Sequence, residues 1–173
     1  MKKKYVFLFF IIVILIFLKH EYNFVAPIIL SSKHICANDG MIVIDFKGPK
    51  AQILWRDGSV SFYCEVREAF YEWNDIIKRQ RIRKFFVQDF SSVKWGSYVG
   101  NWTEACKAVY VIDSFKYGSI GISYIPFSDI VYANLFLNKY HGILVNFNDI
   151  SIDLLDKSND LLKDRMIDLC VNN

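Results

Sequence analysis

The distribution of apolar and polar positions divides the chain into an apolar start and a mixed body. Residues 5–18 are apolar without interruption, follow Lys2-Lys3-Lys4 and end at Lys19. As a helix, this run is about 21 Å long, which is shorter than the ~30 Å hydrocarbon core of a membrane. No good cleavage site follows it. We therefore expect residues 1–26 to be an export signal or an uncleaved membrane anchor with its lysines in the cytoplasm.

The first half of the body predicts the order strand, strand, helix, strand. Residues 51–56 and 59–64 read as strands joined by the two-residue turn Asp57-Gly58. A helix over residues 65–80 then presents one apolar stripe, and residues 82–87 return as a strand. The predicted stripe consists of Val66, Ala69, Phe70, Trp73, Ile76 and Ile77.

The second half repeats this order. Residues 107–112 and 122–125 read as strands, Ser128 begins a helix that continues to about residue 140, and residues 143–147 form the last strand. Gly142 is expected to end the helix, with His141 facing solvent. The predicted buried positions of this helix are Ile130, Val131, Leu135 and Phe136.

These patterns predict an α+β fold of two ββαβ modules packed together. The body spans residues 34–150, with the first module over about 48–90 and the second over about 104–148. The apolar signal or anchor helix precedes the body, and a C-terminal helix over residues 151–173 follows it. The apolar positions of that last helix are Leu155, Leu162, Met166, Leu169 and Cys170.

Most of the formal net charge of +3 belongs to the export segment. Four of the 21 basic residues precede Glu21, which leaves 17 basic side chains against 18 acidic ones in the rest of the chain. A body this close to neutral argues against a nucleic-acid partner. One basic cluster, residues 78–84, lies at the predicted end of the first body helix, where cations favour the helix dipole. Its alternative interpretation is a docking patch for an acidic partner or anionic lipid.

Soft metal-binding side chains gather in the segment before the first strand. His34, Cys36 and Met41 lie within eight residues, and Gly40 allows the chain to turn between them. Thiolate and thioether sulfur suit a soft ion such as Cu(I), and imidazole adds a further donor. A second interpretation stays open, because methionine and free cysteine most often fill cores.

Four cysteines in an exported chain raise a redox question, because oxidising compartments favour disulfides. Cys64 ends the strand whose partner follows the Cys36 loop, so the two sulfurs could meet as a reversible disulfide or as joint Cu(I) ligands. We expect Cys106 to be structural. Met166 and Cys170 share one face of the predicted C-terminal helix, where core packing is favoured over a second metal site.

Longer motifs resemble those of the nitrous-oxide reductase accessory protein (NosL) family. The family loop C-x-x-C-G-M or C-x-x-D-G-M corresponds to residues 36–41, the run G-P-K-A-Q-I to residues 48–53, and the helix start containing V-R-[DE]-A to residues 62–69. The resemblance covers about residues 34–147. Further matches follow in order at Val87-Gln88-Asp89, residues 102–105, residues 108–111, residues 118–121 and Ile125-Pro126-Phe127.

This resemblance implies a periplasmic protein, anchored to the inner membrane, that holds one Cu(I) per chain and delivers it for the assembly of nitrous-oxide reductase. It implies no enzymatic activity. The expected metal ligands are Cys36, Met41, His34 and Cys64. The chain departs from the family at Ile120 and Ser123, where the family has a methionine and an acidic residue. It also lacks a lipobox before Cys36, although many family members are lipoproteins.

Two other functions stay open from the residues alone. In the first, Cys36 and Cys64 form a thiol-based redox or lyase centre with Asp39 as the acid/base group. In the second, the protein is an assembly factor that contacts its partner without metal. The sequence contains no Ser-His-Asp set, no paired catalytic carboxylates and no Gly-rich phosphate loop. A copper-handling accessory protein is therefore the preferred hypothesis.

Overall fold

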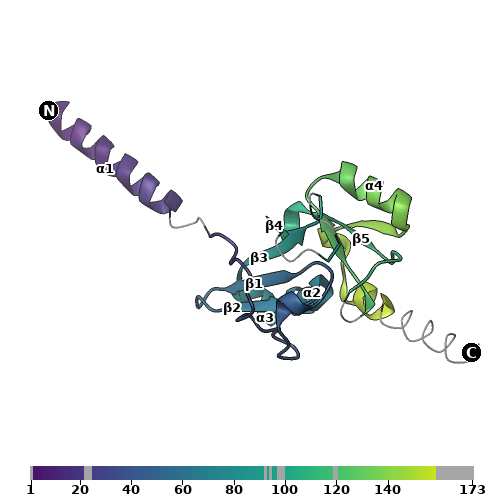
Figure 1. The fold of residues 1–173 in the computed structure, drawn as a ribbon. Helices are drawn as coiled ribbons and strands as arrows, with labels where there is room; N and C mark the ends of the chain where they lie inside the picture. The colour runs from purple at the N-terminus through teal and green to yellow at the C-terminus, as the bar shows by residue number, and fades with distance from the viewer. Residues whose placement is uncertain are drawn as a thin grey trace, which may run out of the picture.

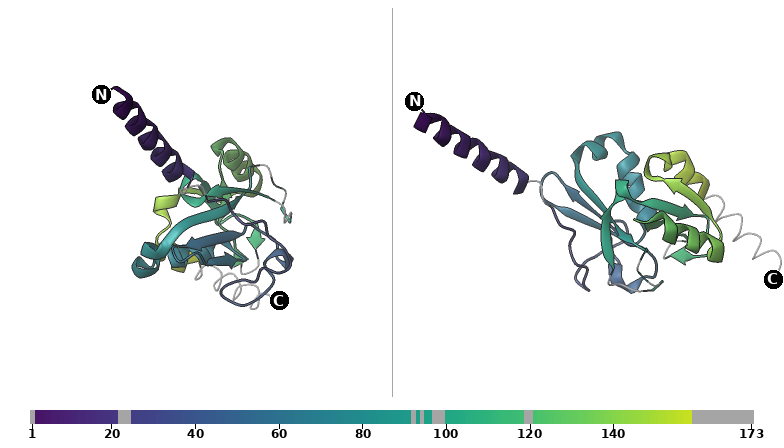
Figure 2. Two further views of the ribbon diagram at one scale, coloured as in Figure 1. Left: turned by 90° about the vertical axis from the view of Figure 1, so that its left-hand side faces the viewer. Right: turned by 90° about the horizontal axis from the view of Figure 1, so that it is seen from above.

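The N-terminal helix α1 (Lys2–Glu21) extends away from the rest of the chain (Figures 1 and 2). The computed structural model of the protein describes residues 2–21, 25–91, 93, 95–96, 100–118 and 121–158. The side chains described in α1 are almost all exposed. Among the described residues, no helix combines the length and the apolar character needed to cross a membrane.

The first sheet is antiparallel and four-stranded, in the order β2-β1-β3-β4. Its strands are β1 (Ala51–Trp55), β2 (Val60–Tyr63), β3 (Ile82–Asp89) and β4 (Asn101–Glu104). The predicted hairpin is present, but its loop has three residues and not two. The N–H of Trp55 donates to the Ser59 carbonyl, so residues 56–58 form the loop, and Gly58 adopts φ 90°. Strand β4 was not predicted from the sequence.

The predicted helix over residues 65–80 is two helices, α2 (Val66–Asn74) and α3 (Ile76–Arg81). Asp75 adopts an extended conformation, and its carboxylate accepts the N–H groups of Ile77 and Lys78, so it begins a new helix. The change of direction leaves Ile76 and Ile77 about three-quarters exposed, and the prediction that they are buried is wrong.

The second sheet has the order β8-β5-β9, with a separate two-stranded ribbon β6-β7. Its strands are β5 (Val109–Ile112), β6 (Tyr117–Gly118), β7 (Gly121–Ile122), β8 (Ile125–Phe127) and β9 (Ile143–Asn146). Helix α4 (Ile130–Tyr140) is capped by Asp129 and not by Ser128 as predicted. Ser128 instead donates its hydroxyl and N–H to Asp89 at the end of β3.

Helix α4 buries a different face from the one predicted. Ala133 is fully buried, and Phe136 packs against Phe127 of β8. The predicted core positions Ile130, Val131 and Leu135 are at least half exposed. The prediction failed because apolar residues surround much of this helix, so spacing alone did not identify the face that meets the sheet.

One core joins the two sheets, and helix α2 lies at its centre. Phe70 packs against Phe85 of the first sheet and Tyr110 of the second. Residues 152–158 are helical and bury Leu155 in the same core. The α+β class, with two ββαβ arrangements, is confirmed. Short 3-10 helices cover Val43–Asp45 (η1), Ala105–Lys107 (η2) and Phe147–Asp149 (η3).

Candidate metal centre

Cys36 lies in a tight turn whose backbone fixes the position of its side chain. The N–H of Cys36 donates to the Met41 carbonyl at 2.7 Å, and the N–H of Gly40 donates to the Cys36 carbonyl at 3.0 Å. Gly40 has φ 73°, a conformation that costs glycine little. Asp39 accepts the N–H of Met41, so the turn closes on itself.

This turn is attached to the edge of the first sheet. Ala37 donates its N–H to the Phe62 carbonyl of β2 at 2.8 Å, and Cys36 forms an isolated parallel bridge with Phe62. Cys64 follows directly after β2, at the junction with the cap of α2. The sheet edge therefore brings together two cysteines that are far apart in the sequence.

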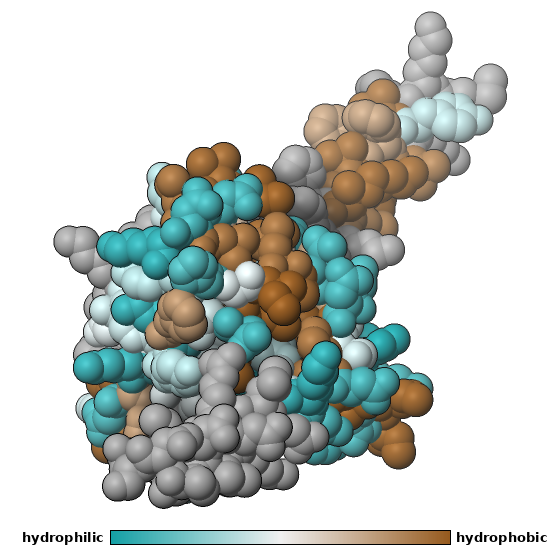
Figure 3. Space-filling model, turned by 90° about the vertical axis from the view of Figure 1, so that its right-hand side faces the viewer, coloured by the Kyte–Doolittle hydropathy of each residue, from teal (hydrophilic) through white to brown (hydrophobic). Residues whose placement is uncertain are grey.

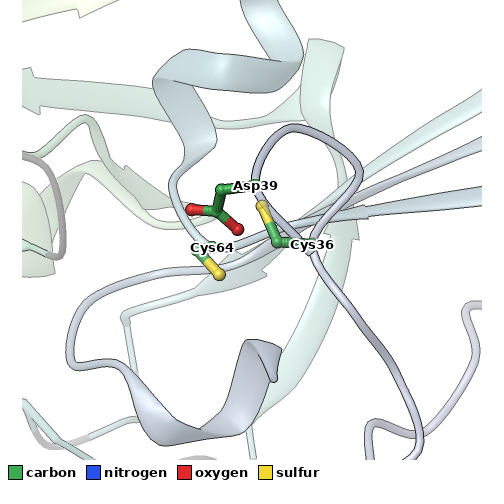
Figure 4. Close-up of side chains that lie close together, drawn as sticks. All are labelled: Cys36, Asp39 and Cys64. Carbon is green, nitrogen blue, oxygen red and sulfur yellow. The ribbon is translucent and has the colours of Figure 1, made fainter. Parts of the chain in front are cut away.

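The thiols of Cys36 and Cys64 and the carboxylate of Asp39 face one another (Figure 4). Their ligand atoms all lie within 4.8 Å of one another. Both cysteines are buried, whereas Asp39 is exposed at the outer side. Two sulfur atoms and one oxygen around a common space can hold a metal ion.

The two thiols differ in acidity. The Cys64 thiol donates to Cys36 and lowers the pKa of Cys36 below the value of an ordinary thiol, although burial opposes this change. The same hydrogen bond, together with burial, raises the pKa of Cys64. Cys36 is therefore the first of the pair to become a thiolate, the form that binds metal.

Glu68 connects helix α2 to the metal loop. Its carboxylate lies 3.6 Å from the Cys36 sulfur, at which distance a protonated thiol donates to it. The other carboxylate oxygen accepts the Asn38 amide at 3.0 Å, and the Glu65 N–H donates to Glu68 within a capping box. Glu68 is 7% exposed, so it forms these contacts largely away from solvent.

Lys50 lies beneath the site with its side chain fully buried. Its ammonium group donates to the carbonyls of Gly48 at 2.9 Å and Cys64 at 3.1 Å. Burial lowers the pKa of Lys50, and the carboxylate of Glu65 opposes this effect. Lys50 thus holds the backbone carbonyl of Cys64 in place through a buried hydrogen bond.

The second half of the chain reaches the same region through Ser123, which lies between β7 and β8 and contacts Glu65, the cap residue of α2. Ser123 donates its hydroxyl to Glu65 at 2.7 Å, and the carboxylate of Glu65 fills the space that a side chain at Gly118 would need. The ribbon β6-β7 is thereby positioned against the start of α2. Ser123, one of the two positions at which the sequence resemblance led us to expect a different residue, supports this junction, whereas the other, Ile120, lies outside the described residues.

His34 lies beside the cluster of Cys36, Cys64 and Asp39 and is not one of its members, whereas Met41 closes the Cys36 turn through its backbone. The Nδ1 atom of His34 accepts the Ser31 N–H at 2.9 Å, and its ring lies 4.5 Å from that of Phe62. Met41 pairs with Cys36 through the backbone, and its side chain is 38% exposed. A cavity of about 410 Å³, lined by His34, Cys36 and Phe62 among others, opens next to the loop, although Cys36 itself is only 2% exposed.

Of the remaining soft donors, Cys106 is the one that the structure describes. Cys106 is exposed beyond β4, and Met166 and Cys170 lie outside the described residues. Sequence reasoning missed Asp39 as a metal donor and Glu68, Lys50 and Asn38 as supports. A capping signal, Glu65 followed three residues later by Glu68, was present in the sequence and could have placed Glu68 at the start of the helix.

The fold and the site define a small α+β protein with two facing buried thiols at the edge of its first sheet. The chain belongs to the NosL family, whose family model matches residues 27–155.

Two relatives show how far this likeness extends. The chain is 29% identical over 126 residues to the copper-binding lipoprotein NosL of Stutzerimonas stutzeri. The matched region covers 72% of this chain and 64% of the relative, so the chain spans just under two thirds of the relative's length. The crystal structure of the copper chaperone NosL from Shewanella denitrificans superposes with a TM-score of 0.68 at 27% identity, over 75% of this chain and 97% of that one. Neither name describes an enzyme, in agreement with the expectation that this protein is not one.

A third relative is known from solution. The NMR structure of apo-NosL from Achromobacter cycloclastes matches with a TM-score of 0.44 and 26% identity, over 61% of this chain and 87% of that one.

Proposed function

We propose that this protein binds one Cu(I) ion through Cys36 and Cys64 and delivers it to a copper-requiring acceptor. The observation that carries the proposal is the approach of the two buried sulfurs and the Asp39 carboxylate to within 4.8 Å of one another. Two thiolates suit Cu(I), which accepts low coordination numbers, whereas structural zinc sites use four ligands. The family relatives named for copper support the choice of ion.

The geometry of the site also suits a protein that transfers its bound copper ion to an acceptor. Cys36 ionises more readily than Cys64, and the cavity beside the loop leaves one side of the site open to an incoming ligand. His34 lines this cavity and the partly exposed Met41 closes the Cys36 turn, so these two residues would serve as secondary ligands during transfer. Asp39 is a further donor candidate.

The acceptor and the location follow from the family resemblance and from the N-terminal segment. The acceptor is nitrous-oxide reductase during its assembly, and the exported body is held at the periplasmic face of the inner membrane by residues 1–26. A fusion reporter after Asn173 should be periplasmic and fractionate with membranes. Recovery of a soluble chain that lacks residues 1–26 would contradict the anchor.

Copper binding is tested with the reduced full-length protein in detergent, without oxygen, in competition with a chromophoric Cu(I) chelator. We expect about one ion per chain and loss of tight binding in Cys36→Ser. Cys64→Ser should weaken binding strongly, whereas the matched variant Cys106→Ser, at an exposed thiol, should bind as wild type does.

The contributions of the other candidate ligands to Cu(I) binding are compared in the same assay with single substitutions. Met41→Leu and Asp39→Asn remove one donor atom at nearly constant volume, and His34→Ala should matter least, mainly through pH. Ile120→Met, which restores the family residue, should tighten binding if its loop faces the thiols. If the wild-type protein takes up no Cu(I) under reducing conditions, the copper proposal fails and a metal-free assembly factor becomes the better proposal. Transfer is then measured as copper uptake by the apo-reductase.

A further inference from the structure

A basic groove lies at the opposite end of the first sheet from the thiols. It is a cavity of about 350 Å³ whose lining includes Arg56, Trp73, Arg79, Arg83, Lys84 and Glu104. We call these residues the basic groove. Three of them, Arg79, Arg83 and Lys84, belong to the basic cluster at residues 78–84. The proposed copper function does not involve this cluster.

The groove concentrates positive charge on a body that is otherwise close to neutral. Three guanidinium groups, from Arg56, Arg79 and Arg83, line it together with the ammonium group of Lys84. The one carboxylate in this lining belongs to Glu104, which lies 2.9 Å from the Lys84 ammonium and also binds Lys107 at 3.0 Å. The charged part of the lining is therefore mainly basic, and the remaining lining residues, which include Ile82, Phe85 and Phe147, are apolar.

Two of these arginines are held in position before any ligand arrives. The guanidinium carbon of Arg79 lies 5.2 Å from the ring centre of Trp73, in a cation–π arrangement. Arg56 donates its Nε–H to the Gln80 carbonyl at 2.8 Å. A positioned guanidinium loses less conformational entropy on binding, and its planar fork matches a carboxylate.

The groove and the thiols are separated along strand β1. Trp55 pairs with Ile82 at the groove end, whereas Ala51 pairs with Tyr63 at the thiol end, next to Cys64. The four steps between Ala51 and Trp55 span about 13 Å at 3.3 Å per residue. A molecule in the groove would therefore leave the metal loop accessible.

We propose that the basic groove binds an acidic segment of a partner protein, with carboxylates on Arg56 and Arg79, the two arginines that are held in position. Its concave shape favours a protruding peptide over a lipid surface, which is flat and meets basic residues on protruding surfaces. Paired hydrogen bonds between guanidinium and carboxylate supply the recognition. This surface goes beyond the copper function, because it involves none of the proposed metal ligands.

The test uses the full-length protein in detergent, free of copper, and a fluorescein-labelled peptide of alternating glutamate and glycine, followed by fluorescence anisotropy. The double variant Arg56→Gln/Arg79→Gln should weaken peptide binding about tenfold or more, because charge-assisted hydrogen bonds are lost. The matched variant Lys139→Gln removes one exposed charge from α4 and should leave binding unchanged. Added salt should weaken wild-type binding. Copper uptake should be the same in all variants, which separates this test from the copper proposal.

The proposal is overturned if the wild-type protein does not bind the peptide at concentrations up to ~1 mM, or if the double variant binds as well as wild type. It is also overturned if the peptide fails to bind while phosphatidylglycerol vesicles bind wild type better than the double variant, because the groove would then be a lipid site. Circular dichroism checks the fold of each variant. If the double variant does not fold, Arg79→Gln alone, at an exposed position, decides the outcome.

Discussion

The helices α2 and α4 cover corresponding positions in the two halves of the molecule but bury different residues. The first five residues of α2 are all buried, and they include the charged Arg67 and Glu68. In α4, Ala133 is the fully buried residue, while Leu135 is 59% exposed. Hydrophobic side chains, drawn in brown, also reach the face of the molecule that Figure 3 shows. Phe70 of α2 contacts both sheets, whereas α4 packs on the second sheet.

This difference shows where the candidate site obtains its rigidity. The start of α2 lies in the junction between the sheets, where Glu65 and Glu68 are buried and hydrogen-bonded to Ser123 and Asn38. Buried polar groups with partners fix a single geometry, because each lost partner costs free energy. The metal loop rests on this junction, and no described contact links it to α4.

The largest effect on stability is expected when the central aromatic ring of the junction, Phe70, is removed. Phe70→Ala should lower the free energy of unfolding by about 3–5 kcal/mol, the range for a large side chain deleted from a core. The counterpart on α4, Phe136→Ala, should cost less, about 1–2 kcal/mol, because Phe136 is half-buried. Urea unfolding followed by circular dichroism measures both. Equal losses would mean that the two helices are equally central.

A second test removes the carboxylate that supports the metal loop. Glu68→Ala should destabilise the fold by about 1–3 kcal/mol, because the Asn38 amide and the Glu65 N–H lose their acceptor. It should also weaken Cu(I) binding by displacing Cys36. Glu72→Ala, one turn further along α2, removes a carboxylate whose partner is the exposed Lys78 and should cost under ~1 kcal/mol. If the two variants behave alike in both assays, Glu68 has no special role at the loop.

The third test concerns the contact between the ends of β3 and β8. Burial alone would raise the pKa of Asp89, but hydrogen bonds from the Ser128 hydroxyl, the Ser128 N–H and the Ser91 N–H lower it overall. A lowered pKa in the folded state gives stability that is present above the unfolded value of ~4 and is lost as the pH falls through the folded pKa. Asp89→Asn should therefore lower the free energy of unfolding by about 1–2 kcal/mol at pH 7. Between neutral and acid pH, the unfolding free energy of this variant should fall less steeply than that of the wild type. Parallel curves of unfolding free energy against pH would rule out this role.

The smallest expected effect is on the outer face of α4. Leu135→Ser replaces a side chain that is 59% exposed, and the free energy of unfolding should change by no more than ~0.5 kcal/mol. Thermal unfolding of the variant and the wild type gives the value. A loss above ~2 kcal/mol would show that another part of the chain covers this face in solution.

Local patterns predicted most of the elements, because strand and helix periods are written into neighbouring residues. The hairpin at residues 51–64 and the strand that begins at Ile82 appear where the alternation places them. The break at Asp75 had a local signal as well, since aspartate is a preferred helix cap. The continuous apolar stripe outweighed that signal, so one helix was predicted where two exist.

The sequence by itself determined the class of the fold and the family, and it indicated Cys36 and Cys64 as sulfurs that could meet. Only the tertiary structure showed that they do meet, that the Asp39 carboxylate joins them, and that His34 is held by Ser31 and Phe62 beside the cluster. The reason is that a loop, a strand end and a helix start converge at one sheet edge, and their separation along the chain leaves no periodic pattern. The burial of Lys50 and Glu68 was decided in the same way, because a charged residue enters an interior only where distant segments supply its hydrogen-bond partners.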